Sequence, residues 1–594
     1  MSTTRPDIAN EAAQSIAPAP SGQVAIVLLG LAASLALLAL HQAALPWRDH
    51  ARMLTLAYTL TLAAPLGAAL LLRRAGDAYA WLCTLAVALL WGALAWHEGG
   101  MMLPTAASAW SHAGIWIYAV TSAVALFLVL AFAGAYRTSP RRLTYPALFA
   151  VAWSHELALV VAQVFTAMGW LLLGLWAGLF QIIGIALFAE VFSNVHFAYP
   201  ATGVLFGLGL MFGRNQAGMI RAMLRVCRVL GMVLLPVIAL VGLSFALALP
   251  FTGLEGLWDT RHAAALLITL VLATVALTNA VFQDGTRGDP PYPRWLRWFV
   301  NGALAVLPVF AALALLAFAM RVRQYGWTVE RLFGVLVAGV ALLFAVGYAL
   351  ALWAARPGTW LRLAAPVNMV TALVLIVGLL ASHAPGTDFR SLAARSQLAR
   401  ALRDPAKADI AYLRWQLGQP GVAALRALEA DPALAAHPEV QAAIRAELAR
   451  QARWTAALPE AADPATRLAV YPHSTAVPDG LWPALLAGIS DYDKQQLGGC
   501  RPTTCVMLGV DLDGDGQYEW LLLSSPGVNL TQAVLALTST GWHVVGSTPR
   551  HDGYTQEDWT TLRKALAAGT WQTHPPRYQD LWIGKQQYVV APRP

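Results

Sequence analysis

The segment DLDGDGQYE carries acidic side chains at alternating positions, a pattern that suits binding of a hard cation. Its candidate ligands are Asp511, Asp513, Asp515, Gln517 and Glu519. Such oxygen ligands converge on Ca²⁺ where glycines let the backbone turn sharply, and carboxylates this close repel one another without a cation. An EF-hand would have Glu at the twelfth loop position, where this chain has leucine, so we expect a calcium loop between two strands. The alternative is a β-hairpin turn without an ion, which Asp-Gly pairs favour by themselves.

Two cysteines, Cys500 and Cys505, stand close together in the polar segment GGCRPTTC. A disulfide between them is the favoured interpretation, and it would persist only in an oxidising compartment. The alternatives are two unpaired thiols or part of a metal site. A zinc site requires further cysteines or histidines at short spacing, which this segment lacks.

A third candidate site is the basic segment MRVRQYGWTVERL, which contains Arg321, Arg323, Tyr325 and Arg331. Arginine forms paired hydrogen bonds with phosphate, so this segment suits an anionic lipid headgroup or a phosphate as ligand. The alternative is that Glu330 and other carboxylates neutralise the basic charge.

The composition indicates whether the chain is soluble or embedded in a membrane. Hydrophobic residues make up 58% of the 594 residues and charged residues 12%, and the mean hydropathy is +0.55. A soluble globular chain has about twice that share of charge, so we expect an integral membrane protein. The formal net charge of +8 comes with arginines in short segments between apolar runs. Arginines in such positions set the orientation of a chain in the membrane, so we expect no binding of nucleic acid.

Apolar runs long enough to cross a hydrocarbon core recur along the first 380 residues. We count eleven, which predicts a bundle of about eleven transmembrane helices. The almost continuously apolar region from Tyr145 to Phe192 leaves two alternatives open, a long tilted helix or an extra re-entrant segment. The runs are Val24 to Leu40, Met53 to Leu72, Ala78 to Trp96, Gly114 to Ala135, Leu157 to Phe180, Pro200 to Phe212, Val229 to Leu249, Ala263 to Phe282, Phe299 to Met320, Leu332 to Trp353 and Ala364 to Ala381.

The arginines between the runs predict the orientation of the chain. Alternate connections hold fifteen arginines on the N-terminal side of the membrane and six on the other. Basic residues in short loops resist translocation, so we expect the N-terminus in the cytoplasm. Eleven crossings then place the C-terminus outside, which in a Gram-negative cell is the periplasm. The basic segment from Arg321 to Arg331 falls on the outer side, against the charge rule, unless the span count is different.

The remaining sequence predicts four regions in chain order. They are a cytoplasmic tail at 1–23, the transmembrane bundle at 24–383, a helical neck at 384–453 and a periplasmic α+β domain at 454–594. Ala, Leu and Arg recur at helical spacing in the neck, with Pro and Gly between the helices. Short strand-like segments such as QAVLALTS and GWHVVGS follow, with a helix near Glu557 to Ala568.

Several membrane segments carry polar residues, which are costly in hydrocarbon. His97 and Glu98 fall at the end of one span, where we interpret them as interfacial residues. Gln163 and Asn279 lie within or near spans, and we expect them to form hydrogen bonds between helices.

The segments MRVRQYGWTVERLFGVLVA, ALTNAVFQDG, TAMGWLLLGLWAGLFQIIGI and VDLDGDGQYEWLLL, with the ending DLWIGKQQYVV, resemble bacterial inner-membrane proteins grouped as domain of unknown function 4153. The resemblance covers most of the chain and rests on several separate segments. It implies a multispanning inner-membrane protein with no assigned activity and no catalytic residues to transfer.

Three functions remain open. The first choice is a non-enzymatic envelope protein whose exported domain binds a ligand or partner, because the chain shows no nucleophile elbow or phosphate-binding glycine loop. The second is a transporter or flippase, which glycine-rich segments such as TGVLFGLGLMFG would permit. The third is a membrane transferase acting on a lipid-linked phosphate. Expected partners are membrane lipids, an anionic lipid headgroup or an envelope protein, and Ca²⁺ is the one cofactor we consider.

Overall fold

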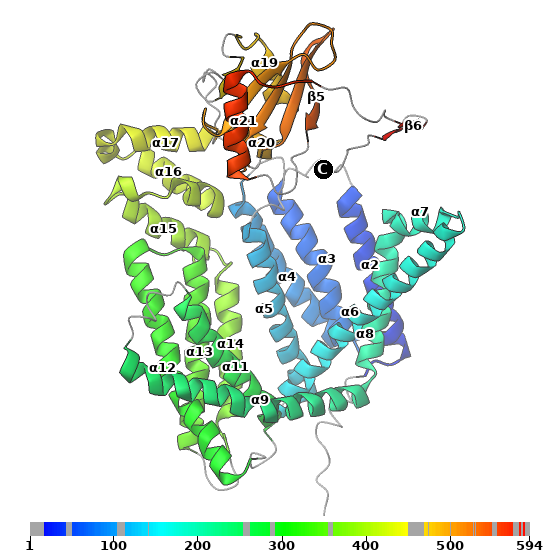
Figure 1. Cartoon of the computed structure of the whole chain (residues 1–594). Coiled ribbons are helices and arrows are strands. Elements are labelled where there is room, and N and C mark those ends of the chain that lie inside the picture. Colours follow the sequence, from blue (N-terminus) through cyan, green and yellow to red (C-terminus); the bar gives the residue numbers. More distant parts are fainter. Residues whose placement is uncertain are drawn as a thin grey trace, which may run out of the picture. The chain divides into compact units, whose positions relative to one another are not determined.

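The chain divides into two compact units, Met1–Glu447 and Leu448–Pro594. The structure is a computed structural model, and helices dominate its first unit (Figure 1). It describes residues 17–42, 50–103, 113–139, 142–253, 262–285, 292–354, 360–449, 468–472, 475–498, 500–526, 528, 530–548, 555–573, 581–583 and 586–588.

The first unit contains the membrane bundle. Within its described residues, eleven helices are long and apolar enough to cross a membrane, as the sequence predicted. A helix satisfies its own backbone hydrogen bonds, which is required where no water is available. These helices are α2 (Pro20–Gln42), α3 (Ala51–Leu71), α4 (Ala78–Met101), α5 (Ala113–Thr138), α6 (Tyr145–Ile182), α8 (Val195–Arg214), α9 (Ala217–Thr252), α11 (Ala263–Phe282), α12 (Arg294–Tyr325), α13 (Val329–Trp353) and α14 (Ala364–Ala381).

The apolar region after Tyr145 forms one continuous helix of 38 residues, α6, followed by the short helix α7 (Leu187–Ser193). The first of the two sequence alternatives, a single long helix, is therefore the one observed. At 1.5 Å per residue α6 is about 57 Å long, nearly twice the thickness of the hydrocarbon core, so it must tilt or extend beyond it.

Two other helices begin or end well outside the predicted apolar runs. Helix α9 begins at Ala217, although the apolar run begins at Val229, so three arginines assigned to a loop are helical. Helix α12 continues to Tyr325, so Arg321 and Arg323 belong to its last turns. Hydropathy misplaced both boundaries because the arginines interrupt the apolar run without interrupting the helix.

The bundle packs as two groups of helices. One buried cluster joins residues of α2 to α6, α8 and the end of α14. A second cluster joins α9, α11, α12, α13 and the start of α14. The Tyr348 hydroxyl lies 2.7 and 2.8 Å from the Oδ1 atoms of Asn279 and Asn368, both in the second group, and Asn368 donates to Tyr145 of α6 at 2.9 Å. The expectation that Asn279 bonds between helices is confirmed, whereas Gln163 is exposed on α6.

An ion pair links α4 and α5 at the end of the bundle where α4 begins. Arg137 lies 2.7 Å from Asp77 and donates to the carbonyl oxygen of Leu71 at 3.0 Å. Burial opposes ionisation of Asp77, but the hydrogen bonds from Arg137 and from the amides of Arg73 and Ala80 prevail, and the pKa of this carboxyl lies below its ordinary value. We call this end of the bundle the Asp77 end, and the end where α4 finishes the Glu98 end.

The segment after α14 forms a series of short helices. Asp388 caps the first of them by accepting the amide of Ser391 at 2.7 Å. These helices are α15 (Phe389–Ala401), a 3₁₀ turn (Pro405–Lys407), a π turn (Tyr412–Gln416), α16 (Gln419–Glu429), a second 3₁₀ turn (Pro432–Ala436) and α17 (Pro438–Ala449).

The second unit is a five-stranded sheet with helices on both faces. Strands β1 (Ala469–Tyr471), β2 (Cys505–Val510), β3 (Glu519–Ser524), β4 (Gln532–Thr538) and β5 (Gly541–Thr548) are neighbours in chain order. Only the β1–β2 pair is parallel among these strands. Helices α19 (Leu481–Gly488) and α20 (Asp491–Gly498) precede β2, α21 (Gln556–Ala568) follows β5, and β6 (Leu581–Ile583) pairs with β7 (Gln586–Tyr588).

Successive residues of β2 face opposite sides of this sheet. Met507 packs in the cluster that includes Leu481 of α19. Val506 and Leu508 pack in the other cluster, with Trp559 of α21. The predicted strands on both sides of the acidic loop and the predicted helix near Glu557 are therefore confirmed.

The glycines of α8 allow this helix to pack directly against the backbone of α2. A Cβ added at Gly203 would overlap the Ser34 hydroxyl and the carbonyl oxygen of Gly30. A Cβ at Gly207 would lie 2.9 Å from the Cα of Val27. Glycine-rich segments permit either close packing or a broken helix, and here the segment forms one continuous helix in close contact, the usual role of small residues between membrane helices.

We predict that Gly203→Val destabilises the bundle, because the added side chain would force α2 and α8 apart. Overpacking costs about 1–3 kcal/mol, which should lower the melting temperature of the detergent-purified protein by several degrees in fluorescence-detected size-exclusion chromatography. Gly174→Val is the matched control, since nothing lies within 4 Å of a Cβ there. Equal melting temperatures for the two variants would contradict close α2–α8 packing.

Candidate functional site

An apolar groove of about 450 Å³ runs along the bundle between α3 and α5. Its lining extends from Leu54 to Leu70 on α3 and from Ile115 to Leu130 on α5. Sixteen residues of helix rise about 24 Å, most of the thickness of a hydrocarbon core. Leu62 lines the groove and is 54% exposed, so the groove opens sideways on the surface of the bundle.

The hydroxyl groups of the groove gather toward the Glu98 end. They belong to Thr55, Tyr58, Thr59, Tyr118 and Ser122, all in the first half of α3 or α5. The Thr59 and Tyr118 oxygens are 3.3 Å apart and form a hydrogen bond. The groove is therefore amphipathic along its length, with an apolar body and one hydroxylated end.

A buried charged cluster lies beside this hydroxylated end. The carboxylate of Glu98, which is 3% exposed, is 2.5 Å from a guanidinium nitrogen of Arg390 and 3.2 Å from Nδ1 of His383. The imidazole of His97 lies 3.5 Å from the carboxylate of Asp388. These contacts join the end of α4 to the residues that follow α14 and to α15. We name the five side chains the Glu98 cluster.

The Glu98 cluster contacts the groove through Tyr118. The Tyr118 ring lines the groove and meets the His383 ring edge to face, with centroids 5.1 Å apart. His383 and Tyr118 therefore connect the Glu98 cluster to the hydroxylated end of the groove by direct contact.

His383 also contacts a hydroxyl, which invites comparison with a catalytic triad. Its Nε2 is 2.7 Å from Oγ1 of Thr121, so Glu98, His383 and Thr121 form a chain of carboxylate, imidazole and hydroxyl. The carbonyl oxygen of Ile117, 2.6 Å from the Thr121 hydroxyl, competes with the imidazole for the hydroxyl proton. The chain fastens α5 to the residues after α14.

The predicted phosphate segment lies in and around the turn between α12 and α13. Arg331 stacks on the ring of Tyr325 at 5.4 Å and donates to the carbonyl oxygen of Gly326 at 2.7 Å. Arg400 of α15 also approaches this ring, at 5.9 Å, and donates to the backbone oxygen of Tyr325 at 3.0 Å. The structure thus brings Tyr325 and Arg331 together and adds Arg400, whereas Arg321 and Arg323 are exposed at the end of α12. Phosphate binding there stays a prediction.

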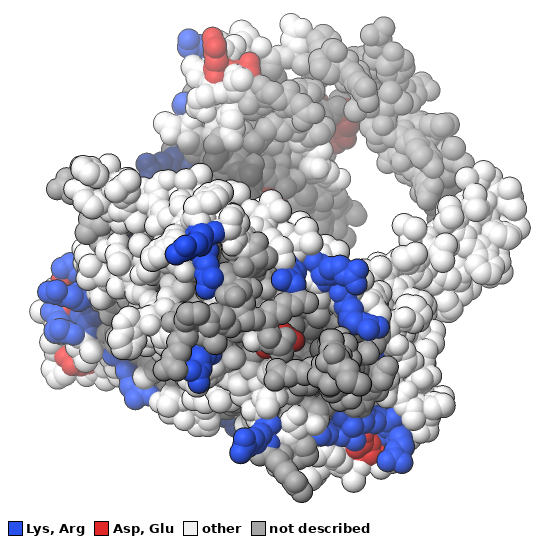
Figure 2. Space-filling model, turned by 90° about the horizontal axis from the view of Figure 1, so that it is seen from below, with Lys and Arg blue, Asp and Glu red and all other residues white. Residues whose placement is uncertain are grey.

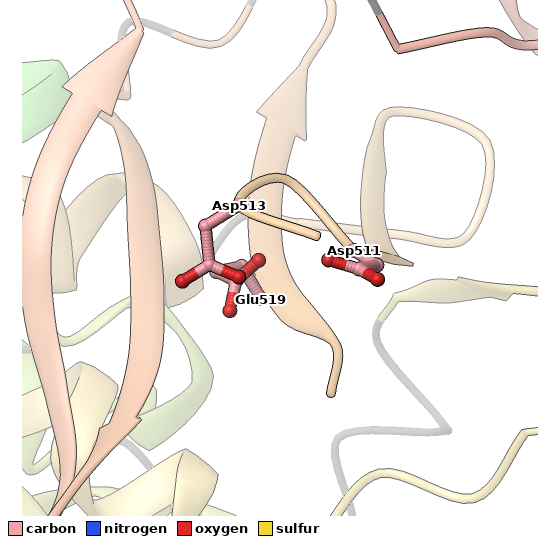
Figure 3. Close-up of side chains that lie close together, drawn as sticks. All are labelled: Asp511, Asp513 and Glu519. Carbon is pink, nitrogen blue, oxygen red and sulfur yellow. The ribbon is translucent and has the colours of Figure 1, made fainter. Parts of the chain in front are cut away.

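The acidic loop connects β2 to β3, as predicted (Figure 3). One carboxylate oxygen from each of Asp511, Asp513 and Glu519 lies within 4.8 Å of the others, close enough for one metal ion. Asp515 is outside this group, because it accepts the amide and the side chain of Gln517 at 2.7 and 3.2 Å. Three of the five predicted ligands are therefore together, and calcium binding stays a prediction.

Backbone amides already donate hydrogen bonds to two of these three carboxylates. Asp511 accepts the amides of Gly514 and Gly516 at 2.6 and 3.1 Å, and Glu519 accepts that of Leu512 at 2.7 Å. These bonds shape the turn and are compatible with both alternatives, the calcium loop and the hairpin turn.

Cys500 and Cys505 are joined as a disulfide in the structure, with their Cα atoms 5.5 Å apart. This is an ordinary separation for a disulfide. The redox state of the pair in the cell stays a prediction, because it depends on the compartment.

Comparison with known families assigns the chain. The family model for "Domain of unknown function (DUF4153)" matches residues 59–428. The chain belongs to this family. The DUF4153 match includes α4 to α16, and with them the whole Glu98 cluster and most of the groove. Comparison with curated proteins and with solved structures finds no match.

Sequence reasoning placed His97 and Glu98 at a span end but missed His383, Asp388 and Arg390. These three residues directly follow the last span, where they resemble ordinary interfacial residues. The available signal was a second group of ionisable residues at a span end that the topology places on the same side as Glu98.

We predict that Glu98→Gln and Arg390→Gln each destabilise the protein by roughly 3 kcal/mol, because each leaves a buried charge without its partner. The double variant should lose clearly less than the sum of the two single losses. Thermal unfolding of all four proteins in one detergent measures this coupling. Lys407→Gln breaks an exposed ion pair with Asp404 and should cause no measurable change. Additive losses at Glu98 and Arg390 would refute the pairing.

Proposed function

We propose that this protein binds a membrane lipid, holding a lipid chain in the groove between α3 and α5. The observation that carries the proposal is the groove itself, which follows the bundle for most of the membrane thickness and opens sideways. Its volume of about 450 Å³ is within the range of small-molecule sites, roughly 300–1,000 Å³. A lipid would enter from the bilayer with its chain along α3 and its polar part at the Glu98 end.

A second observation supports a ligand that carries an oxygen acceptor. Trp91 lines the groove and is 1% exposed, and its indole Nε1 has no hydrogen-bond partner among the described residues. A buried donor without a partner costs about 1–3 kcal/mol. An ester or phosphate oxygen of the ligand would accept this hydrogen bond.

The charges beside the groove favour binding over catalysis. Glu98 contacts Arg390 and His383, and Asp388 contacts His97, so both carboxylates of the cluster are already engaged by side chains of the protein. Among the described residues, the groove lining contributes hydroxyl groups and no charged side chain. We therefore place a lipid-binding function ahead of a transferase. The alternative function is transport of the bound lipid, because the groove extends over most of the membrane thickness.

We infer that the Glu98 end faces the periplasm of a bacterial inner membrane, with the N-terminus in the cytoplasm. Fifteen arginines against six support this orientation, and the eleven candidate spans among the described residues support an odd number of crossings, with Pro594 opposite the N-terminus. Alkaline phosphatase fused after Pro594 should then be active in cells, and green fluorescent protein at the same position should be dark. A fluorescent fusion with inactive phosphatase would reverse the orientation.

We predict that Ala123→Trp prevents the lipid from binding, because Ala123 is an exposed residue of the groove lining and an indole there would fill the groove. The full-length protein, purified in mild detergent, should release a lipid on solvent extraction, and mass spectrometry should find it reduced about tenfold or more in the variant. Trp91→Phe keeps the ring but removes the donor, and should weaken retention about fivefold, the equivalent of roughly 1 kcal/mol.

Val124→Trp is the matched control for Ala123→Trp. Val124 is the next residue of α5, is 42% exposed and does not line the groove. Lipid retained equally by all variants would show that the lipid binds elsewhere on the bundle and would refute the proposal.

A further inference from the structure

The first part of α9, residues 217–230, extends beyond the helices that it packs against. Gly231 lies beside Leu277, Ala280 and Val281, which are in the last turns of α11. The 20 residues of α11 already span about 30 Å, the thickness of a hydrocarbon core. The end of this segment at residue 230 therefore lies at the membrane boundary on the Asp77 end, and the residues before it extend past the end of α11.

Interfacial residues of α12 mark the same boundary independently. Trp295 and Trp298, in the first turns of α12, are 71% and 74% exposed, as in the aromatic belts of membrane proteins. Tyr292, just before this helix, donates to the carbonyl oxygen of Met232 at 3.1 Å. The level of the tryptophans on α12 is therefore close to the level at which residues 217–230 of α9 end.

Residues 217–230 have three distinct faces. Arg221, Arg225 and Arg228 stand at positions i, i+4 and i+7, which form one stripe of a helix. Met223, Val226 and Leu230, on the opposite side, are 39%, 53% and 53% exposed. The face between them includes Ile220, which is 8% exposed, and Leu224, whose carbonyl oxygen accepts from Gln283 at 2.7 Å.

Such a helix fits neither phase fully: exposing its apolar face to water is unfavourable, and burying its arginines in hydrocarbon is unfavourable. It suits the boundary between the two, where the apolar side chains enter the acyl region and the arginines reach the headgroups. Lys and Arg also outnumber Asp and Glu on the surface seen from this end of the bundle (Figure 2). Nε of Arg228 is buried and has no hydrogen-bond partner among the described residues, so an acceptor is missing there.

We propose that residues 217–230 of α9 form an in-plane interfacial helix that binds anionic phospholipid through Arg221, Arg225 and Arg228. Phosphate oxygens of the headgroups accept hydrogen bonds from the guanidinium groups, and Met223, Val226 and Leu230 lie among the upper acyl carbons. This surface is at the Asp77 end, apart from the groove opening, and does not depend on the proposed function of the groove.

The test uses the full-length protein in phosphatidylcholine bilayers with a trace of spin-labelled phosphatidylglycerol or phosphatidylcholine. The fraction of labelled lipid that is motionally restricted reports its affinity for the protein. The wild type should prefer phosphatidylglycerol, and a variant with all three arginines changed to Gln should lose this preference about fivefold or more, as should the wild type in 1 M salt. A variant with Lys at the three positions should retain most of the preference for phosphatidylglycerol, because it keeps the positive charge.

The control changes three exposed arginines after the bundle, Arg395, Arg403 and Arg501, to Gln, which alters the net charge equally. If this control loses its preference for phosphatidylglycerol equally, net charge alone explains the effect, and the proposal is overturned. Depth is tested with single spin labels at Val226→Cys and Arg225→Cys, each in a background in which the free cysteines Cys83 and Cys227 are changed to Ser. The first should be accessible to oxygen and the second to a water-soluble relaxant, and two water-exposed labels would overturn the in-plane position.

Discussion

A carboxylate buried at the end of a membrane bundle must be neutralised, and this requirement connects distant parts of the fold. Glu98 is at the end of α4, whereas its partners His383 and Arg390 follow α14. Because an unpaired buried charge costs several kcal/mol, these contacts fix where α15 begins. The same histidine touches Tyr118, so the hydroxylated end of the groove depends on this pairing as well.

The two ends of the bundle solve different physical problems. At the Asp77 end, arginines cap helix ends from inside the bundle: Arg214 is 3% exposed and donates to the carbonyl oxygens of Ala69 and Leu72 at 2.6 and 2.8 Å. Other arginines of this end, on α9, remain on the surface. At the Glu98 end the charged residues pair with one another, and the polar surface offered to a ligand consists of hydroxyl groups.

Most of the architecture could be predicted because it depends on local signals. Run length gave the eleven spans, and the Asp-Gly loop between two apolar segments gave the β2–β3 hairpin. Boundaries set by charge were less predictable, since the arginines of α9 were assigned to a loop although their spacing is helical. The groove could not be predicted. The ionisable residues at two span ends were a signal for the Glu98 cluster, but Glu98 and His383 are 285 residues apart, and only tertiary packing shows that they pair.

The central claim is that the groove between α3 and α5 holds a lipid chain, and a cryo-electron microscopy map of the wild-type protein in lipid nanodiscs tests it most directly. We expect one continuous elongated density from the Tyr118 side of the groove toward Leu130, in contact with Trp91. A groove closed by rearranged side chains, or one no more ordered than the surrounding bilayer, would contradict the account.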